Sequence, residues 1–160
     1  MTAASWIASA GICVHAVSRT REFLLTGMHG RDSRCHPEVV LRCLIVDDSL
    51  RFLDAARGLL EIEGICVVGV ASTGAQALMR VEELRPDIAL VDIELGAESG
   101  FEIAGQLHRQ GAPGAPKVIL ISTHAEQDYR DLIAASPALG FVPKSALSAR
   151  AIFDLLERQG

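Results

Sequence analysis

The sequence lacks the features that would mark a nucleic-acid-binding or membrane protein. It has no run of Lys or Arg, and its net charge is −5, whereas nucleic-acid-binding surfaces are normally basic. Its first apolar stretch, WIASAGICVHAV, is shorter than the ~20 residues that cross a bilayer as a helix. No basic region precedes that stretch, as a secretory signal would require. We therefore expect no direct contact with nucleic acid or membrane.

Paired cysteines are also missing. The four cysteines, Cys13, Cys35, Cys43 and Cys66, include no C-x-x-C pair. Two of them lie in apolar runs, which favours reduced, buried thiols in a cytoplasmic protein. The remaining cysteines and the histidines near them match no zinc-binding spacing.

The chain is long enough for one domain and a short tail. It has 160 residues, of which 49% are hydrophobic and 22% are charged. We interpret residues 1–38 as a poorly ordered extension or an artefact of the chosen start site, with Met28 as an alternative start. Residues 39–160 then form the domain.

From Val39 onward, short apolar runs alternate with segments of helical period. The apolar runs are Val39–Val46, Ile65–Ala71, Ile88–Val91, Val118–Ile121 and Gly140–Val142. The helical segments are Ser49–Glu63, Gly74–Leu84, Gly100–Arg109, Ala125–Ala135 and Ser145–Glu157. The runs are nearly continuous Val, Ile and Leu, which is typical of a parallel sheet covered on both faces. Five such units predict an α/β fold, a doubly wound three-layer sandwich.

The first helical segment shows which face should be buried. Leu53, Ala56 and Leu60 fall on one face, with Phe52 and Leu59 beside them. Charged residues fall opposite. We expect this apolar face to pack on the sheet.

Acidic residues follow two of the predicted strands. Asp47 and Asp48 come directly after Val46, and Asp92 comes directly after Val91. In doubly wound sheets the ligand site lies outside the carboxyl ends of the strands, so we expect these acids to converge at a rim rather than in the core. Three carboxylates repel one another, and Mg²⁺, which prefers oxygen ligands, would remove that repulsion.

Two other strand ends supply groups that suit a phosphoryl group. KVILIST ends on Ser122 and Thr123, and Lys144 follows the last apolar run. A hydroxyl can donate a hydrogen bond, and an ammonium can neutralise charge. Asp92 would then be the nucleophile that forms an aspartyl phosphate.

Four stretches together resemble a known family. They are LIVDDS, RPDIALVDIEL followed by SGFE, KVILIST, and GFVPK, in that order. Over about residues 39–158 the sequence is similar to the receiver domain of two-component response regulators. The resemblance implies a flavodoxin-like (βα)5 sandwich with five parallel strands in the order 2-1-3-4-5.

The resemblance implies a role for each residue of the acid cluster. Asp92 would accept a phosphoryl group from the phospho-His of a sensor histidine kinase or phosphotransfer protein. Asp47, Asp48 and Asp92, with the backbone carbonyl of Glu94, would bind Mg²⁺, for which Mn²⁺ can substitute. Lys144 would hold the phosphoryl group. Such a domain catalyses its own phosphorylation and dephosphorylation and is not a conventional enzyme.

The resemblance also implies a two-state switch. Ser122 would move toward the phosphoryl group, and Phe141 would rotate inward into the vacated space. The face formed by 125–135, 140–142 and 145–157 would change shape and bind an unidentified downstream protein or a second copy of the chain. Phe141 on its own would suit a core position better than a switch position.

Several residues depart from the usual pattern of the family or modulate it. Gly96 replaces a Pro, and Ser145 replaces the Pro that often follows the lysine in a cis bond, so we expect a trans bond. Thr123 stands where Ala is frequent. By the resemblance, Glu94 and His124 flank the phosphoryl site and tune its lifetime.

Other readings of the sequence stay open. The predicted last helix reaches about Arg158, so we expect a stand-alone receiver. VVGVASTGAQAL, however, resembles receivers joined to a helix-turn-helix DNA-binding domain, so the chain could be a truncated relative of such a transcription regulator. A phosphorylation-independent interaction module is a further alternative. A phosphatase of the D-x-D type is disfavoured because Glu94 stands at the second position.

Overall fold

A parallel five-stranded sheet forms the centre of the domain. The structure is a computed structural model that describes residues 40–110 and 113–159. The sheet contains β1 (Arg42–Val46), β2 (Cys66–Ala71), β3 (Ile88–Asp92), β6 (Lys117–Ser122) and β7 (Gly140–Pro143). Its order is β2-β1-β3-β6-β7, and all neighbouring strands are parallel. The predicted doubly wound fold and its strand order are therefore confirmed.

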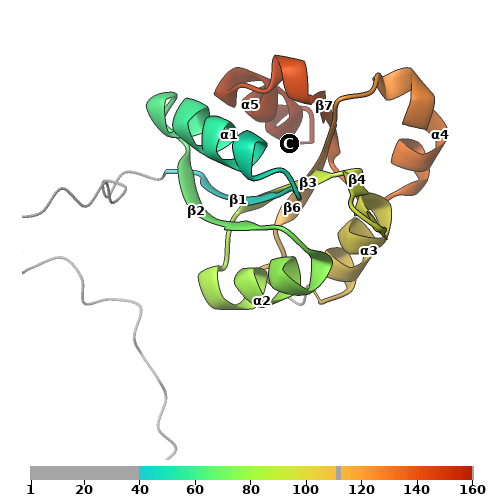
Figure 1. Ribbon diagram of the computed structural model, residues 1–160, viewed down its shortest axis with the longest axis horizontal. Coiled ribbons are helices and arrows are strands. Elements are labelled where there is room, and N and C mark those ends of the chain that lie inside the picture. Colours follow the sequence, from blue (N-terminus) through green and yellow to red (C-terminus); the bar gives the residue numbers. More distant parts are fainter. Residues whose placement is uncertain (1–39, 111–112, 160) are drawn as a thin grey trace, which may run out of the picture. The chain divides into compact units, whose positions relative to one another are not determined.

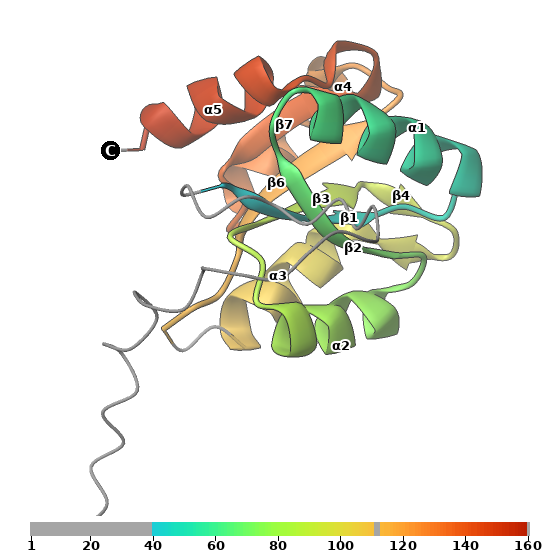
Figure 2. The same ribbon diagram turned by 90° about the vertical axis from the view of Figure 1, so that its left-hand side faces the viewer.

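Helices cover both faces of this sheet (Figures 1 and 2). They are α1 (Leu50–Ile62), α2 (Gly74–Leu84), α3 (Gly100–Gln110), α4 (Glu126–Ala135) and α5 (Ala149–Glu157). One hydrophobic cluster joins α1 and α5 to the sheet, and a second joins α2 and α3 to its other face, with part of α4 packed against it. None of the described helices is long and apolar enough to cross a membrane.

The burial of each strand follows its place in the sheet. The central strand β3 is buried at every position, and β1 and β6 are buried after their first residue. The edge strand β2 alternates between buried and half-buried positions, because an edge strand is covered less completely. Continuous apolar runs thus mark the central strands, as the sequence predicts.

The faces of the helices follow the predicted pattern with one exception. Leu53, Ala56 and Leu60 of α1 are buried, and Phe52 packs beside them. Leu59 is 41% exposed, so its placement on the buried face was wrong. Around the helix axis, residue 59 lies about 100° from residue 60 and about 120° from residue 53, which is outside the stripe that 53, 56 and 60 define.

Two short elements differ from the expected boundaries. The last helix begins at Ala149 rather than Ser145, because Lys144–Ala146 form a 3₁₀ turn and the Ser148 hydroxyl accepts a hydrogen bond from Ala151 N. A hairpin of β4 (Glu94–Leu95) and β5 (Glu98–Ser99) follows β3. Gly96, at φ +58°, makes the turn of this hairpin.

The cysteines behave differently from one another. Cys43 is a free, buried thiol in β1, and burial raises its pKa to about 12. Cys66 is disulfide-bonded, so the expectation of reduced thiols is wrong for that residue. The predictions for the extension 1–38 lie outside the described residues.

One glycine fixes how closely α3 approaches the end of β3. The backbone N–H of Gly100 donates to the Ile93 carbonyl oxygen at 2.9 Å. A Cβ at Gly100 would overlap the backbone carbonyl of Asp92. The first residue of α3 therefore has to be glycine if the Asp92 backbone is to keep its place.

A matched pair of glycine substitutions tests this contact. We expect Gly100→Ala to lower the free energy of unfolding by about 1–3 kcal/mol, because β3 must shift to make room. Gly58→Ala, on the exposed side of α1 with nothing within 4 Å, should raise it by about 0.5–1 kcal/mol. Urea unfolding followed by circular dichroism measures both. Equal stability of the two variants would contradict the close approach.

Candidate functional site

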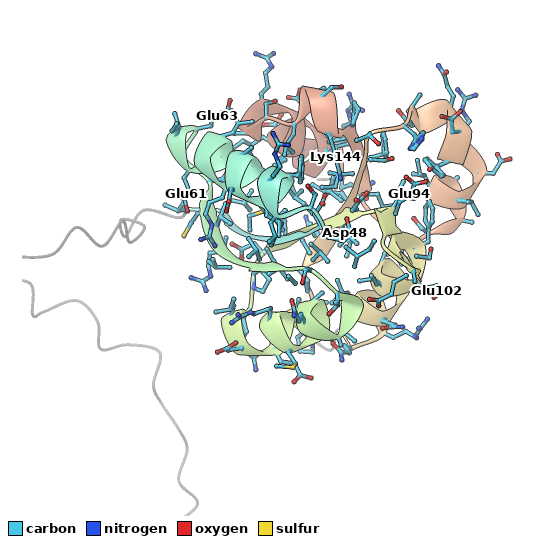
Figure 3. All side chains as sticks on the ribbon, in the orientation of Figure 1. Asp48, Glu61, Glu63, Glu94, Glu102 and Lys144 are labelled. Carbon is cyan, nitrogen blue, oxygen red and sulfur yellow. The ribbon has the colours of Figure 1, made fainter. Side chains whose placement is uncertain are left out.

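Three strands bring their terminal residues to one end of the sheet. Asp47 and Asp48 follow β1, Asp92 ends β3, and Lys144 follows β7. One carboxylate oxygen from each of the three acids lies within 4.8 Å of the others. Figure 3 shows Asp48, Lys144 and Glu94 at this end, although they come from different segments. The topology therefore assembles the predicted cluster.

Two of the three acids are buried, which corrects the expectation that they stand at an open rim. Asp47 is 0% exposed and Asp92 is 5% exposed, whereas Asp48 is exposed. Burial is possible because the oxygens have partners. Asp47 Oδ1 accepts from Ser49 N at 2.8 Å, and Asp92 Oδ1 accepts from Glu94 N at 3.2 Å. A carboxylate that is hydrogen-bonded and paired costs much less to bury.

Lys144 bridges the remaining oxygens of the two buried acids. Its Nζ lies 2.5 Å from Asp47 Oδ2 and 2.8 Å from Asp92 Oδ2. The side chain is only 13% exposed. Burial alone would lower its pKa, but the hydrogen bonds to the two acids raise the pKa of Lys144 above its ordinary value. The ammonium therefore stays charged in this position.

Burial dominates the electrostatics of Asp92. It raises the pKa of the Asp92 carboxyl, and the nearby charge of Asp47 adds to this effect. The hydrogen bond and the positive charge of Lys144 lower the pKa in part, without cancelling the increase. Asp92 is thus a largely buried acid that the contacts with Glu94 N and Lys144 hold in a fixed orientation.

The donor set suits a hard divalent cation. One ammonium only partly balances three carboxylates, and oxygen ligands are those that Mg²⁺ prefers. Asp48 contributes an exposed carboxylate and Asp47 and Asp92 contribute buried ones, so a cation would bind at the mouth of the cluster. The part of Glu94 in this set, its backbone carbonyl, stays a prediction.

An aromatic ring that the sequence analysis assigned only to a packing face also touches this site. The Lys144 ammonium lies 4.5 Å from the centre of the Phe52 ring. No cis peptide bond occurs in residues 40–110 and 113–159, so the bond after Lys144 is trans, as expected. Lys144–Ala146 form a 3₁₀ turn directly after β7.

Ser122 lies at the end of β6 and Phe141 lies in β7, and their roles in a switch stay predictions. Ser122 is fully buried at the end of β6, and its Oγ accepts from His124 N at 3.0 Å. Phe141 is 8% exposed and packs in the cluster beneath α2 and α3. The ring is thus already inside in this conformation, and an inward rotation has no outward starting point here. Thr123 is exposed.

Three polar side chains meet beside the cluster. Glu94 Oε2 lies 3.3 Å from His124 Nδ1, and the Tyr129 hydroxyl donates to Glu94 Oε1 at 3.1 Å. The Tyr129 ring stands edge-on to His124 and tilted against Phe101. Burial and the Glu94 carboxylate raise the pKa of Tyr129. The resemblance drew attention to Glu94 and His124, whereas Tyr129 lies in a segment of helical period and has no sequence signal that sets it apart.

Comparison with known proteins points to the same family as the fold and the acid cluster. The family model described as the response regulator receiver domain matches residues 43–156. The chain is 32% identical over 106 residues to the uncharacterized transcriptional regulatory protein YvfU of Bacillus subtilis, covering 66% of this chain and 52% of YvfU. It is 38% identical over 84 residues to a protein-glutamate methylesterase/protein-glutamine glutaminase of Desulfotalea psychrophila, covering 52% of this chain and 22% of that protein.

A solved structure shares the fold. The receiver domain of the putative response regulator NarL from Mycobacterium tuberculosis superposes with a TM-score of 0.64 at 27% identity, over 74% of this chain and 95% of that one. The chain spans about half the length of YvfU and about a fifth of the methylesterase. The matching family model, the strand order and the acid cluster agree, and the chain belongs to the response regulator receiver domain family.

Proposed function

We propose that this receiver accepts a phosphoryl group on Asp92 from the phospho-His of a sensor histidine kinase or phosphotransfer protein. The observation that carries the proposal is the cluster bridged by Lys144. The ammonium contacts Asp92 and Asp47, and one carboxylate oxygen of each of the three acids lies within 4.8 Å of the others. A carboxylate oxygen of Asp92 forms the new bond to phosphorus while the bond from phosphorus to the donor imidazole nitrogen breaks. The imidazole leaves with the electron pair.

The residues around Asp92 supply position and charge. Glu94 N–H orients one oxygen of Asp92, and Lys144 neutralises charge beside the other. Mg²⁺, held by Asp47, Asp48, Asp92 and the Glu94 carbonyl, with Mn²⁺ as a substitute, would neutralise charge on the transferring group. The Ser122 hydroxyl, now an acceptor for His124 N, would turn to donate to the phosphoryl group.

The weak packing of α4 suggests which surface would respond to phosphorylation. The helix has no buried residue, and Tyr129 and Ile133 make its partly buried contacts. A phosphoryl group carrying about −1.5 to −2 charges would bias an existing equilibrium of the surface formed by α4, β7 and α5. Because Phe141 is already inside, Ser122 and α4 are the parts that would move. That surface would bind a downstream protein or a second copy of the chain.

A DNA-binding output is the second candidate, because a relative of this chain is named a transcriptional regulatory protein. YvfU is named a transcriptional regulatory protein, and the matched part covers about half of it. The chain would then be the receiver part of such a regulator in the cytoplasm. The methylesterase relative shows that a receiver of this family also occurs with an enzymatic output.

Phosphoryl uptake tests the proposal directly. With acetyl phosphate and Mg²⁺ we expect the wild-type chain to gain the mass of one phosphoryl group, and Asp92→Asn to gain none, because the amide is not a nucleophile. Asp54→Asn, an exposed acid on α1, is the control and should react like wild type. Intact-protein mass spectrometry reads the result. A wild-type chain that stays unmodified would favour the phosphorylation-independent alternative.

Mg²⁺ binding forms a second prediction. Because the cation binds the folded chain, adding Mg²⁺ should raise the melting temperature, and a chelator should reverse the effect. Asp48→Asn should weaken Mg²⁺ binding by about tenfold or more, since outer contacts alone are worth 10–100-fold. Asp54→Asn should bind like wild type. Titration calorimetry measures both, and equal affinities would remove Asp48 from the ligand set.

The Glu94 bridge gives a third prediction, on the lifetime of the phosphoryl group. Glu94 lies two residues after Asp92 and contacts His124 and Tyr129. If these side chains shield Asp92 from water, Glu94→Ala should shorten the lifetime severalfold. Glu102→Ala, an exposed acid on α3, should leave it unchanged. Loss of label after removal of excess donor gives the rate. An unchanged or longer lifetime in Glu94→Ala would show that the bridge does not shield Asp92.

A further inference from the structure

The Lys144 ammonium has a neutral neighbour besides its two acids. It lies between Asp47 Oδ2, Asp92 Oδ2 and the face of the Phe52 ring, whose centre is 4.5 Å away. Phe52 stands in the first turn of α1, and its ring packs against the cluster beneath α1 and α5. The negative face of an aromatic ring attracts an ammonium at this distance. Lys144 is therefore held from two sides, by anions and by a ring.

The contacts of Lys144 with the two acids and with the Phe52 ring respond differently when a cation binds the acids. Asp47 and Asp92 belong to the acid cluster that suits a divalent cation, so a bound cation would compete with Lys144 for the same two carboxylates. It also repels the ammonium, because both are positive. The Phe52 ring binds no hard cation through oxygen and does not titrate. It is the contact to Lys144 that loading of the acids leaves intact.

The backbone around Lys144 gives little other restraint. The bond to Ser145 is trans, and Ser145 and Ala146 of the 3₁₀ turn are exposed. The lysine stem is long and has several rotatable bonds. Without the ring, an ammonium displaced from the acids could turn to solvent at small cost.

We propose that Phe52 is a positioning residue that keeps the Lys144 ammonium beside Asp92 while metal and phosphoryl group occupy the acids. This inference rests on the proposed phosphorylation of Asp92. The ring acts through Lys144 and makes no contact of its own with the reacting atoms. A purely structural Phe52 would only fill space on the inner face of α1.

Two substitutions separate these roles. Phe52→Leu keeps an apolar side chain in the packing and removes the ring face, whereas Phe52→Tyr keeps the ring. We expect Phe52→Leu to slow phosphorylation by acetyl phosphate at saturating Mg²⁺ by about three- to tenfold, the range that a partly buried cation–π contact provides. Phe52→Tyr should restore the wild-type rate. Urea unfolding of both variants checks that the folded state is fully populated.

A double-mutant cycle excludes a packing effect. In a Lys144→Ala background the ring has no ammonium to hold, so adding Phe52→Leu should cause no further loss of rate. A loss of equal size in both backgrounds, or a Phe52→Leu rate equal to wild type, would overturn the inference. If the wild-type chain takes up no phosphoryl group at all, the proposed function fails instead. The two failures are therefore distinguishable.

Discussion

The arrangement depends on one ammonium placed between two buried carboxylates. Asp47 and Asp92 are almost completely buried, and their negative charges would repel each other strongly without Lys144. Removing one partner from such a group typically costs 3–5 kcal/mol, because an unpaired charge is left out of contact with water. The strand order places β1, β3 and β7 so that their ends meet, and Gly100 lets α3 approach close behind Asp92. The fold thus assembles charges that the site requires.

Because Lys144 pairs with both acids, the site responds to any group that binds one of them. Lys144 shares its charge between two acids, so any group that binds one of them changes the balance at the other. Burial raises the pKa of Asp92 even with Lys144 beside it, which shows that the carboxylate is not fully compensated. A site held in partial compensation gains free energy when a cation arrives. The neutral Phe52 ring, 4.5 Å from the Lys144 ammonium, is unaffected by such changes in charge.

Local sequence patterns predicted the sheet, the helices and the residues that meet at the site, because continuous apolar runs and helical period reflect burial directly. The β4–β5 hairpin was missed, since two-residue strands have no period to detect. The burial of Asp47 and Asp92 was missed because it depends on pairing with Lys144, distant in sequence. Phe52 and Tyr129 were missed as site residues for a related reason. Each looks like an ordinary helix position until the neighbouring strand end is placed beside it.

The link from the site to the surface is short and polar. Glu94 lies two residues after Asp92 and accepts a hydrogen bond from Tyr129, which belongs to α4. Since α4 buries no residue, its place depends on a few contacts such as this one and the tilted packing of Tyr129 on Phe101. Negative charge added at Asp92 would act first on Glu94 and, through it, on Tyr129. A weakly packed helix that a few contacts hold beside the site needs only a small free-energy change to shift its population.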